Sequence, residues 1–293
     1  MSGPDQVART LLKAALPSIP VVNRLPGVRK TAADPSSLHE LRSVTPDPDH
    51  VRAYARVCGF PVKDDVPLTF PHVLAFPLHM AVMAAPEFPF PAIGTVHLAN
   101  TITRQRVLKV GETLQVEVHT SPTRPHPKGT AIDFLSRVSV GEETVWEGVS
   151  TYLRLGRREA GPARGLATSA GAGDEADRVV PGRVTWRLGG DVGRRYAAVS
   201  GDHNPIHLYP LTARAFGFRR QIAHGMWTLA RCVAALENRL PEAVRVDAAF
   251  KKPVFLPGTV AFGQDAHDGE IAFALTSPTT GVPHLVGRTR APA

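Results

Sequence analysis

The sequence predicts an α+β fold built from two similar halves, each a long helix followed by antiparallel strands. Both halves show the same order: a Tyr-Ala segment, an apolar helix that begins near a histidine, and strands that turn at a glycine. These features span residues 54–120 in the first half and 196–263 in the second. After each glycine, apolar and polar residues alternate, as in "TLQVEV" at 113–118, which is typical of a half-buried strand. The halves are therefore loose repeats of one unit.

In the first half, "LTFPHVLAFPLHMAVMAA" (68–85) predicts the apolar helix, and strands follow within 94–120, 132–140 and 144–155. In the second half the helix is expected within 220–240. Its apolar residues recur at helical spacing and form one stripe, namely Met226, Leu229, Val233 and Leu236. Strands are expected within 244–263, 270–277 and 284–290.

The composition changes sharply over residues 156–182, which are rich in Gly, Ala and charged residues and lack apolar periodicity. Such a segment is typical of a surface linker. We therefore divide the chain into an N-terminal extension (1–45), a first domain (46–155), a linker (156–183) and a second domain (184–293).

The overall composition favours a packed, water-soluble globular protein over a nucleic-acid or membrane protein. The 293 residues are 43% hydrophobic, and the formal net charge is +8. That excess suits an anionic partner, but the basic residues are scattered and form no arginine-rich arm, so we expect no nucleic-acid binding. No apolar run is long enough to span a membrane.

The two cysteines, Cys58 and Cys232, lie in different halves, which argues against a disulfide framework. Near the N-terminus, Pro17 and Pro20 interrupt a short apolar stretch that contains Lys13, so a secretory signal is not expected. We predict a cytoplasmic location.

The segment "SGDHNPIH" (200–207) concentrates groups that can carry chemistry. One interpretation is structural, because Asn204 followed by Pro205 is typical of a helix N-cap and first residue. A catalytic interpretation uses Asp202 and His207, since a carboxylate and an imidazole held by a rigid turn could bind one water and move its proton. Asn204 could hydrogen-bond the same water or hold the carboxylate.

A second motif, "IAHGMW" (222–227), places Gly225 where the second apolar helix begins. Its free N–H and the helix dipole could stabilise a thioester carbonyl as it becomes enolate-like. The alternative is that Gly225 serves only close packing and His224 only fills the core. No metal is expected, because His203 and His207 lack a third ligand at motif spacing.

Residues 196–229, "YAAVSGDHNPIHLYPLTARAFGFRRQIAHGMWTL", resemble the MaoC-like (R)-specific enoyl-CoA hydratases of the hot-dog fold. The D-x-N-P-x-H pattern of that family falls on Asp202, Asn204 and His207, and its thioester-binding glycine falls on Gly225. The resemblance implies that these three residues form the hydratase site and that the Gly225 N–H binds the thioester oxygen.

The first half is similar to the degenerate repeat of double hot-dog members, since it lacks D-x-N-P-x-H and Val73 follows His72. The implied fold has two antiparallel sheets, each wrapped around a long central helix, with a degenerate N-terminal half. That half would supply the other wall of the acyl pocket through Phe76, Met80 and Met83, although ordinary helix core also explains these side chains. Across nearly the whole chain, the order of motifs is similar to actinobacterial 3-hydroxyacyl-thioester dehydratases.

The resemblance implies a hydro-lyase of fatty-acid metabolism that interconverts trans-2-enoyl and (3R)-3-hydroxyacyl thioesters of CoA or acyl-carrier protein, with no cofactor. A homodimer is a further expectation. The alternatives are a hot-dog acyl-CoA thioesterase, a non-catalytic acyl-thioester-binding subunit, and a hydratase for small branched or dicarboxylic enoyl-CoA. Basic residues near the motifs could dock CoA phosphates or phosphopantetheine, or form a solvated face; they are Arg194, Arg195, Lys251 and Lys252.

Overall fold

The computed structural model describes residues 35–92, 94–156 and 179–292. Most of the expected N-terminal extension and most of the expected linker lie outside these ranges. None of the helices in the described ranges is long and apolar enough to cross a membrane.

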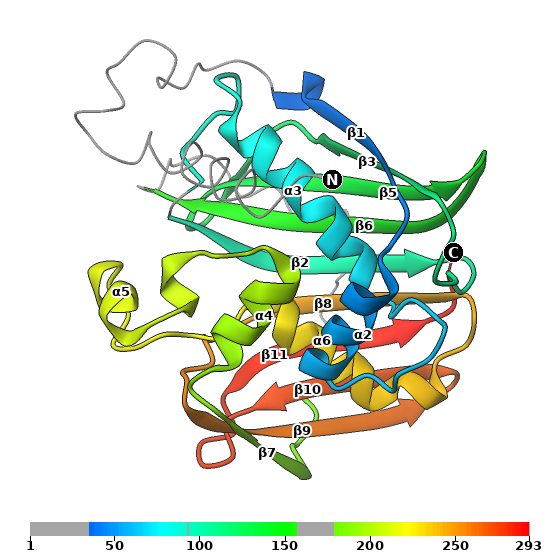
Figure 1. The fold of residues 1–293 in the computed structure, drawn as a ribbon. Helices are drawn as coiled ribbons and strands as arrows, with labels where there is room; N and C mark the ends of the chain where they lie inside the picture. Colours follow the sequence, from blue (N-terminus) through cyan, green and yellow to red (C-terminus); the bar gives the residue numbers. More distant parts are fainter. Residues whose placement is uncertain (1–34, 93, 157–178, 293) are drawn as a thin grey trace.

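The described residues form one antiparallel sheet of eleven strands with helices on one of its faces (Figure 1). The strands are β1 (His39–Val44), β2 (Thr95–Arg104), β3 (Leu114–Thr120), β4 (Arg124–His126), β5 (Gly129–Val140), β6 (Glu143–Leu155), β7 (Val184–Leu188), β8 (Val244–Phe250), β9 (Gly258–His267), β10 (Glu270–Thr276) and β11 (Pro283–Arg290). Their order is β1-β3-β5-β6-β2-β8-β11-β10-β9-β7, and β4 pairs with β5 at the side of this path.

The strand order confirms that the halves are repeats of one unit. Outward from the middle of the sheet, the first half runs β2, β6, β5, β3, β1, and the second runs β8, β11, β10, β9, β7. Apart from the short β4, each half thus places its second strand at the centre and its first strand at the edge. The α+β hot-dog fold expected from the sequence is present in both halves.

Two features of the sheet differ from the expectation. The two sheets are continuous, because β2 and β8 pair from Ala99 opposite Ala249 to Arg104 opposite Val244. The first half also begins earlier than the expected boundary at residue 46, because β1 pairs with β3 along the edge of the sheet.

Two long helices cross the same face of the sheet, one in each half (Figure 1). The helical elements are η3 (Pro35–Ser37), α2 (Pro48–Cys58), α3 (Phe70–Ala84), α4 (Val192–Ser200), η5 (Pro205–His207), α5 (Pro210–Ala215), α6 (Gly225–Leu236) and η6 (Glu237–Arg239). The four side chains of the predicted apolar stripe on α6 are all buried, which confirms the helix and its inward face. On α3, buried residues occur all round, as expected for a helix enclosed by protein.

The helices of the two halves also contact each other directly. The Trp227 indole donates a hydrogen bond to the Val57 carbonyl oxygen at 3.1 Å. The rings of Tyr54 and Tyr196 lie 6.1 Å apart, centroid to centroid. Cys58 and Cys232 are buried and free, so no disulfide joins the halves. Apolar packing and the shared sheet hold the two repeats together as one unit.

Candidate active site

The D-x-N-P-x-H loop follows directly from the end of α4. Gly201 ends this helix in the left-handed region at φ 75°, and its N–H bonds to the Ala197 carbonyl. The loop is then fixed by its own side chains, because Asp202 Oδ1 accepts from the Asn204 N–H at 3.1 Å and Asn204 Oδ1 accepts from the Ile206 N–H at 3.3 Å. Asn204 therefore caps η5, as the structural interpretation predicted. That role positions Asp202 and His207 on either side of the turn.

His207 is buried and has a defined tautomer. Its Nδ1 lies 2.9 Å from the Ile222 carbonyl oxygen. Because a carbonyl oxygen only accepts, Nδ1 carries the proton, and Nε2 of the neutral ring is left as the base. Burial lowers the pKa of His207, although the Asp202 carboxylate opposes the shift, so the ring is neutral at neutral pH. Gly193 of α4 permits this placement, since a Cβ there would lie 1.9 Å from the His207 carbonyl oxygen.

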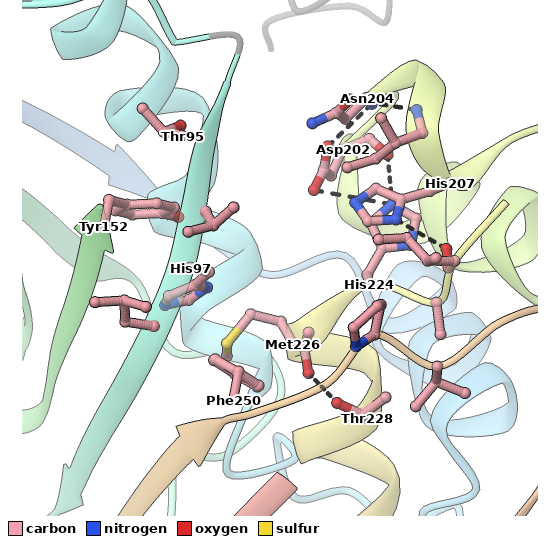
Figure 2. A pocket seen from close by; sticks show the side chains of 18 of the residues that line it. Thr95, His97, Tyr152, Asp202, Asn204, His207, His224, Met226, Thr228 and Phe250 are labelled. Atoms are coloured by element: carbon pink, nitrogen blue, oxygen red, sulfur yellow. Dashed lines mark hydrogen bonds and ion pairs between the residues drawn. The ribbon is translucent and has the colours of Figure 1, made fainter. Parts of the chain in front are cut away.

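His224, which the sequence presented only as a residue that could fill the core, belongs to the same group. Its Nε2 lies 2.9 Å from the Asp202 carbonyl oxygen and 3.8 Å from Asp202 Oδ2. Its ring is stacked on His207 with centroids 3.8 Å apart (Figure 2). Burial, and then the neighbouring His207, lower the pKa of His224 to about 3. His203, in contrast, is exposed and lies outside the group.

The structure thus corrects the expectation that no third metal-ligand candidate accompanies these histidines. One ligand atom from each of Asp202, His207 and His224 lies within 4.8 Å of the others, so the three could hold a metal ion. The third group comes from another segment, which local spacing does not reveal. In the observed arrangement, however, His207 Nδ1 and His224 Nε2 both donate to carbonyl oxygens.

Gly225 is the first residue of α6, next to this group. The first N–H groups of a helix have no partner within it, so the Gly225 N–H can donate to a ligand. Phe250 covers the position closely, because a Cβ on Gly225 would lie 3.2 Å from Phe250 Cε1. Glycine therefore leaves space for a ligand to approach the helix end.

All of these groups line one cavity of about 650 Å³ that both halves enclose. Asp202, Asn204, His207, His224 and Gly225 contribute from the second half. From the first half, the cavity is lined by His72, Phe76, Met80, Met83, His97 and Tyr152. Phe76, Met80 and Met83 are also buried in the core, as ordinary helix packing predicts, and their contact with an acyl chain stays a prediction.

The four basic residues named from the sequence divide into two pairs. Lys251 and Lys252 line the cavity where the chain leaves β8, and both are exposed. Arg194 instead donates to the Leu208 carbonyl oxygen at 3.0 Å and lies over the Tyr209 ring. Arg195 pairs with Asp191 at 3.9 Å. Only the lysines are placed to meet a ligand that extends from the cavity.

Comparison with known proteins gives the family of the chain. Residues 173–286 match the family model described as MaoC like domain. The whole chain is 36% identical over 286 residues to 3-hydroxyacyl-thioester dehydratase X of Mycobacterium tuberculosis, covering 96% of this chain and 97% of that protein. The chain belongs to the MaoC-like family. This MaoC-like protein also matches a crystal structure of HtdX from M. tuberculosis with a TM-score of 0.74 and 36% identity, covering 86% of this chain and all of that one.

A shorter match lies with the (R)-specific enoyl-CoA hydratase of Aeromonas caviae, at 35% identity over 78 residues. It covers 25% of this chain and 58% of that enzyme.

Proposed function

We propose that this MaoC-like protein reversibly hydrates a trans-2-enoyl thioester to the (3R)-3-hydroxyacyl thioester. The observation that carries the proposal is the cavity in which the Asp202 carboxylate, the His207 imidazole and the Gly225 helix end meet. The names of the related dehydratase and hydratase support the same reaction.

In the hydration direction, Asp202 and His207 Nε2 hold one water beside C3 of the substrate. His207 Nε2 takes one proton as the water oxygen bonds to C3, and the adjacent Asp202 carboxylate stabilises the imidazolium. The thioester oxygen becomes enolate-like against the Gly225 N–H. The same proton then moves from His207 to C2, so one hydrogen of water ends on C2 and the other stays in the new hydroxyl. Dehydration is the reverse.

We further propose that the reaction needs no metal or redox cofactor. The hydrogen bonds of His207 and His224 to carbonyl oxygens fix neutral, singly protonated rings, and the proposed proton transfer requires no group beyond His207 and Asp202. The thiol carrier, CoA or acyl-carrier protein, would extend past Lys251 and Lys252. A cytoplasmic location and a homodimer stay predictions.

The experiment follows loss of enoyl-thioester absorbance with crotonyl-CoA and with a longer trans-2-enoyl-CoA, alongside a free-thiol assay. We expect hydration without thiol release, and its loss in Asp202→Asn and His207→Ala variants whose circular dichroism matches wild type. Thiol release in place of hydration would identify the thioesterase. Intact hydration in both variants would exclude the proposed base.

A further inference from the structure

The cavity carries polar groups that the proposed hydration does not use. Tyr152 of β6 and His97 of β2 line the wall contributed by the first half, across from Asp202 and His207 (Figure 2). The degenerate half therefore does more than offer an apolar surface to an acyl chain. Hydrogen-bonding groups in a mainly apolar pocket are what fixes the orientation and identity of a ligand.

Tyr152 is held rigidly in this wall. Its ring is stacked on His97 with centroids 4.5 Å apart and an interplanar angle of 20°. On its other side, His97 lies 4.9 Å from the Phe250 ring, and Tyr152 lies 5.4 Å from Phe134. This series of aromatic contacts fixes where the phenol oxygen points, so little conformational entropy would be lost when a ligand binds it.

Both polar atoms lack partners within the described part of the chain. No hydrogen bond of the Tyr152 hydroxyl occurs there. His97 Nε2 is buried and likewise unpaired among those residues. Buried polar atoms in native proteins are nearly always hydrogen-bonded, so the unpaired His97 Nε2 calls for a partner such as a ligand atom or a water, and the partly exposed Tyr152 lines the same cavity.

The contacts also place this pair along the acyl chain. Gly225, which would bind the thioester oxygen, packs closely against Phe250, and Phe250 contacts His97. Tyr152 is thus two ring contacts away from the thioester end of the cavity, on the side opposite the proposed water. If the acyl chain held at Gly225 runs along Phe250 and His97, it meets Tyr152 beyond C3.

The Tyr152 and His97 side chains in this wall are polar but uncharged, and the charged first-half residue that lines the cavity is the exposed Lys128. Burial lowers the pKa of His97 to about 3 and that of His72 to about 4, and it raises the pKa of Tyr152. All three are neutral at neutral pH, and Asp202 across the cavity is acidic. A carboxylate on the acyl chain beside Tyr152 and His97 would therefore find no counter-charge in these two side chains, whereas a hydroxyl or ketone could hydrogen-bond to them.

We propose that Tyr152 and His97 form a subsite that binds an uncharged oxygen, a hydroxyl or a ketone, on the acyl chain beyond C3. The substrates of this protein are then oxygenated acyl thioesters in preference to plain alkyl ones. This inference rests on the proposed function, because it takes the thioester to lie at Gly225.

The test compares trans-2-enoyl-CoA thioesters of equal length, with a hydroxyl or ketone at successive positions beyond C4, against the unsubstituted parent. For at least one position, the wild-type protein should have a kcat/KM about tenfold higher for the oxygenated substrate than for the unsubstituted parent substrate, which is the effect of one hydrogen bond to a neutral group. In Tyr152→Phe, which removes only the hydroxyl, this ratio should fall to about one. The control Tyr209→Phe, at an exposed tyrosine outside the cavity, should keep the wild-type ratio.

A second readout does not depend on catalysis. Titration calorimetry with saturated acyl-CoA pairs, on the Asp202→Asn variant, should show the same preference for the oxygenated ligand. Hydration without any preference in either assay would overturn the subsite and leave the proposed function intact. Absence of hydration together with a preference in calorimetry would overturn the proposed function alone. A preference that survives in Tyr152→Phe would place the oxygen elsewhere and overturn the subsite.

Discussion

Substitution of His224 tests whether catalysis depends on a hydrogen bond between two separate segments of the active site. Replacing it by leucine removes the hydrogen bond from Nε2 to the Asp202 carbonyl oxygen, 2.9 Å long, and keeps an apolar side chain of similar size against His207. A buried carbonyl that loses its donor costs about 1–3 kcal/mol. Because this bond is only partly buried, we take about 1–2 kcal/mol, which corresponds to about five- to thirtyfold in a rate.

We expect His224→Leu to lower kcat for crotonyl-CoA hydration by that factor while KM changes little, because Asp202 is no longer held against His207. His224→Gln, whose amide can still donate, should recover most of the loss. The matched control is His50→Leu, which removes a histidine-to-carbonyl hydrogen bond of 2.6 Å to Val199 outside the cavity. It should lower the free energy of unfolding, measured in urea, without lowering kcat.

The opposite pattern would refute this reasoning. If His224→Leu folds, loses stability like the control and keeps the wild-type kcat, then His224 fills the core and does not position Asp202.

Four further predictions concern pH, the Gly225 helix end and a possible metal. Below pH 6.5 the histidines of the unfolded chain bind protons that the buried histidines of the folded protein exclude, so the free energy of unfolding should fall with acid. Burial lowers the pKa of His72 to about 4 and that of His224 to about 3. At pH 5 each of the two should therefore lower the free energy of unfolding, measured in urea, by about 2 kcal/mol. kcat/KM should likewise fall only below pH 6.5, as His207 becomes protonated, and a fall that begins above pH 7 would contradict this. Gly225→Val should lower kcat/KM by about tenfold or more through crowding against Phe250, and an unaffected rate would remove Gly225 from the thioester site. Dialysis against EDTA should leave kcat unchanged, whereas a loss that Zn²⁺ restores would show that Asp202, His207 and His224 hold a metal.

Local patterns predicted the parts of this molecule that local physics decides. The stripe from Met226 to Leu236 repeats with the period of a helix, and all four of its side chains are buried. The cap formed by Asn204 before Pro205 is also local, and it brings Asp202 and His207 to the same cavity. These features could be predicted because each depends on residues only a few positions apart.

The parts that sequence reasoning missed depend on contacts between distant segments. His224 hydrogen-bonds to Asp202, which lies 22 residues earlier in the chain. The motif around its neighbour Gly225 indicated only a helix end, so the contact with Asp202 was not predicted. The pairing of β2 with β8 uses backbone groups that no side-chain pattern marks. β1 was missed because, as an edge strand with Leu41 60% exposed, it has no buried face to produce a clear alternation. The signal for His224 was its place directly before the helix glycine.

The central claim is that Asp202 and His207 act from one side of the substrate, with one proton moving from water to C2. Hydration of crotonyl-CoA in D₂O, followed by NMR of the product, tests it most directly. Proton transfer by His207 predicts a single deuterium at C2, on the same face as the new C3 hydroxyl, and no free thiol. Deuterium on the opposite face or on both faces would contradict it, because Asp202 and the proton-carrying His207 lie on one wall of the cavity.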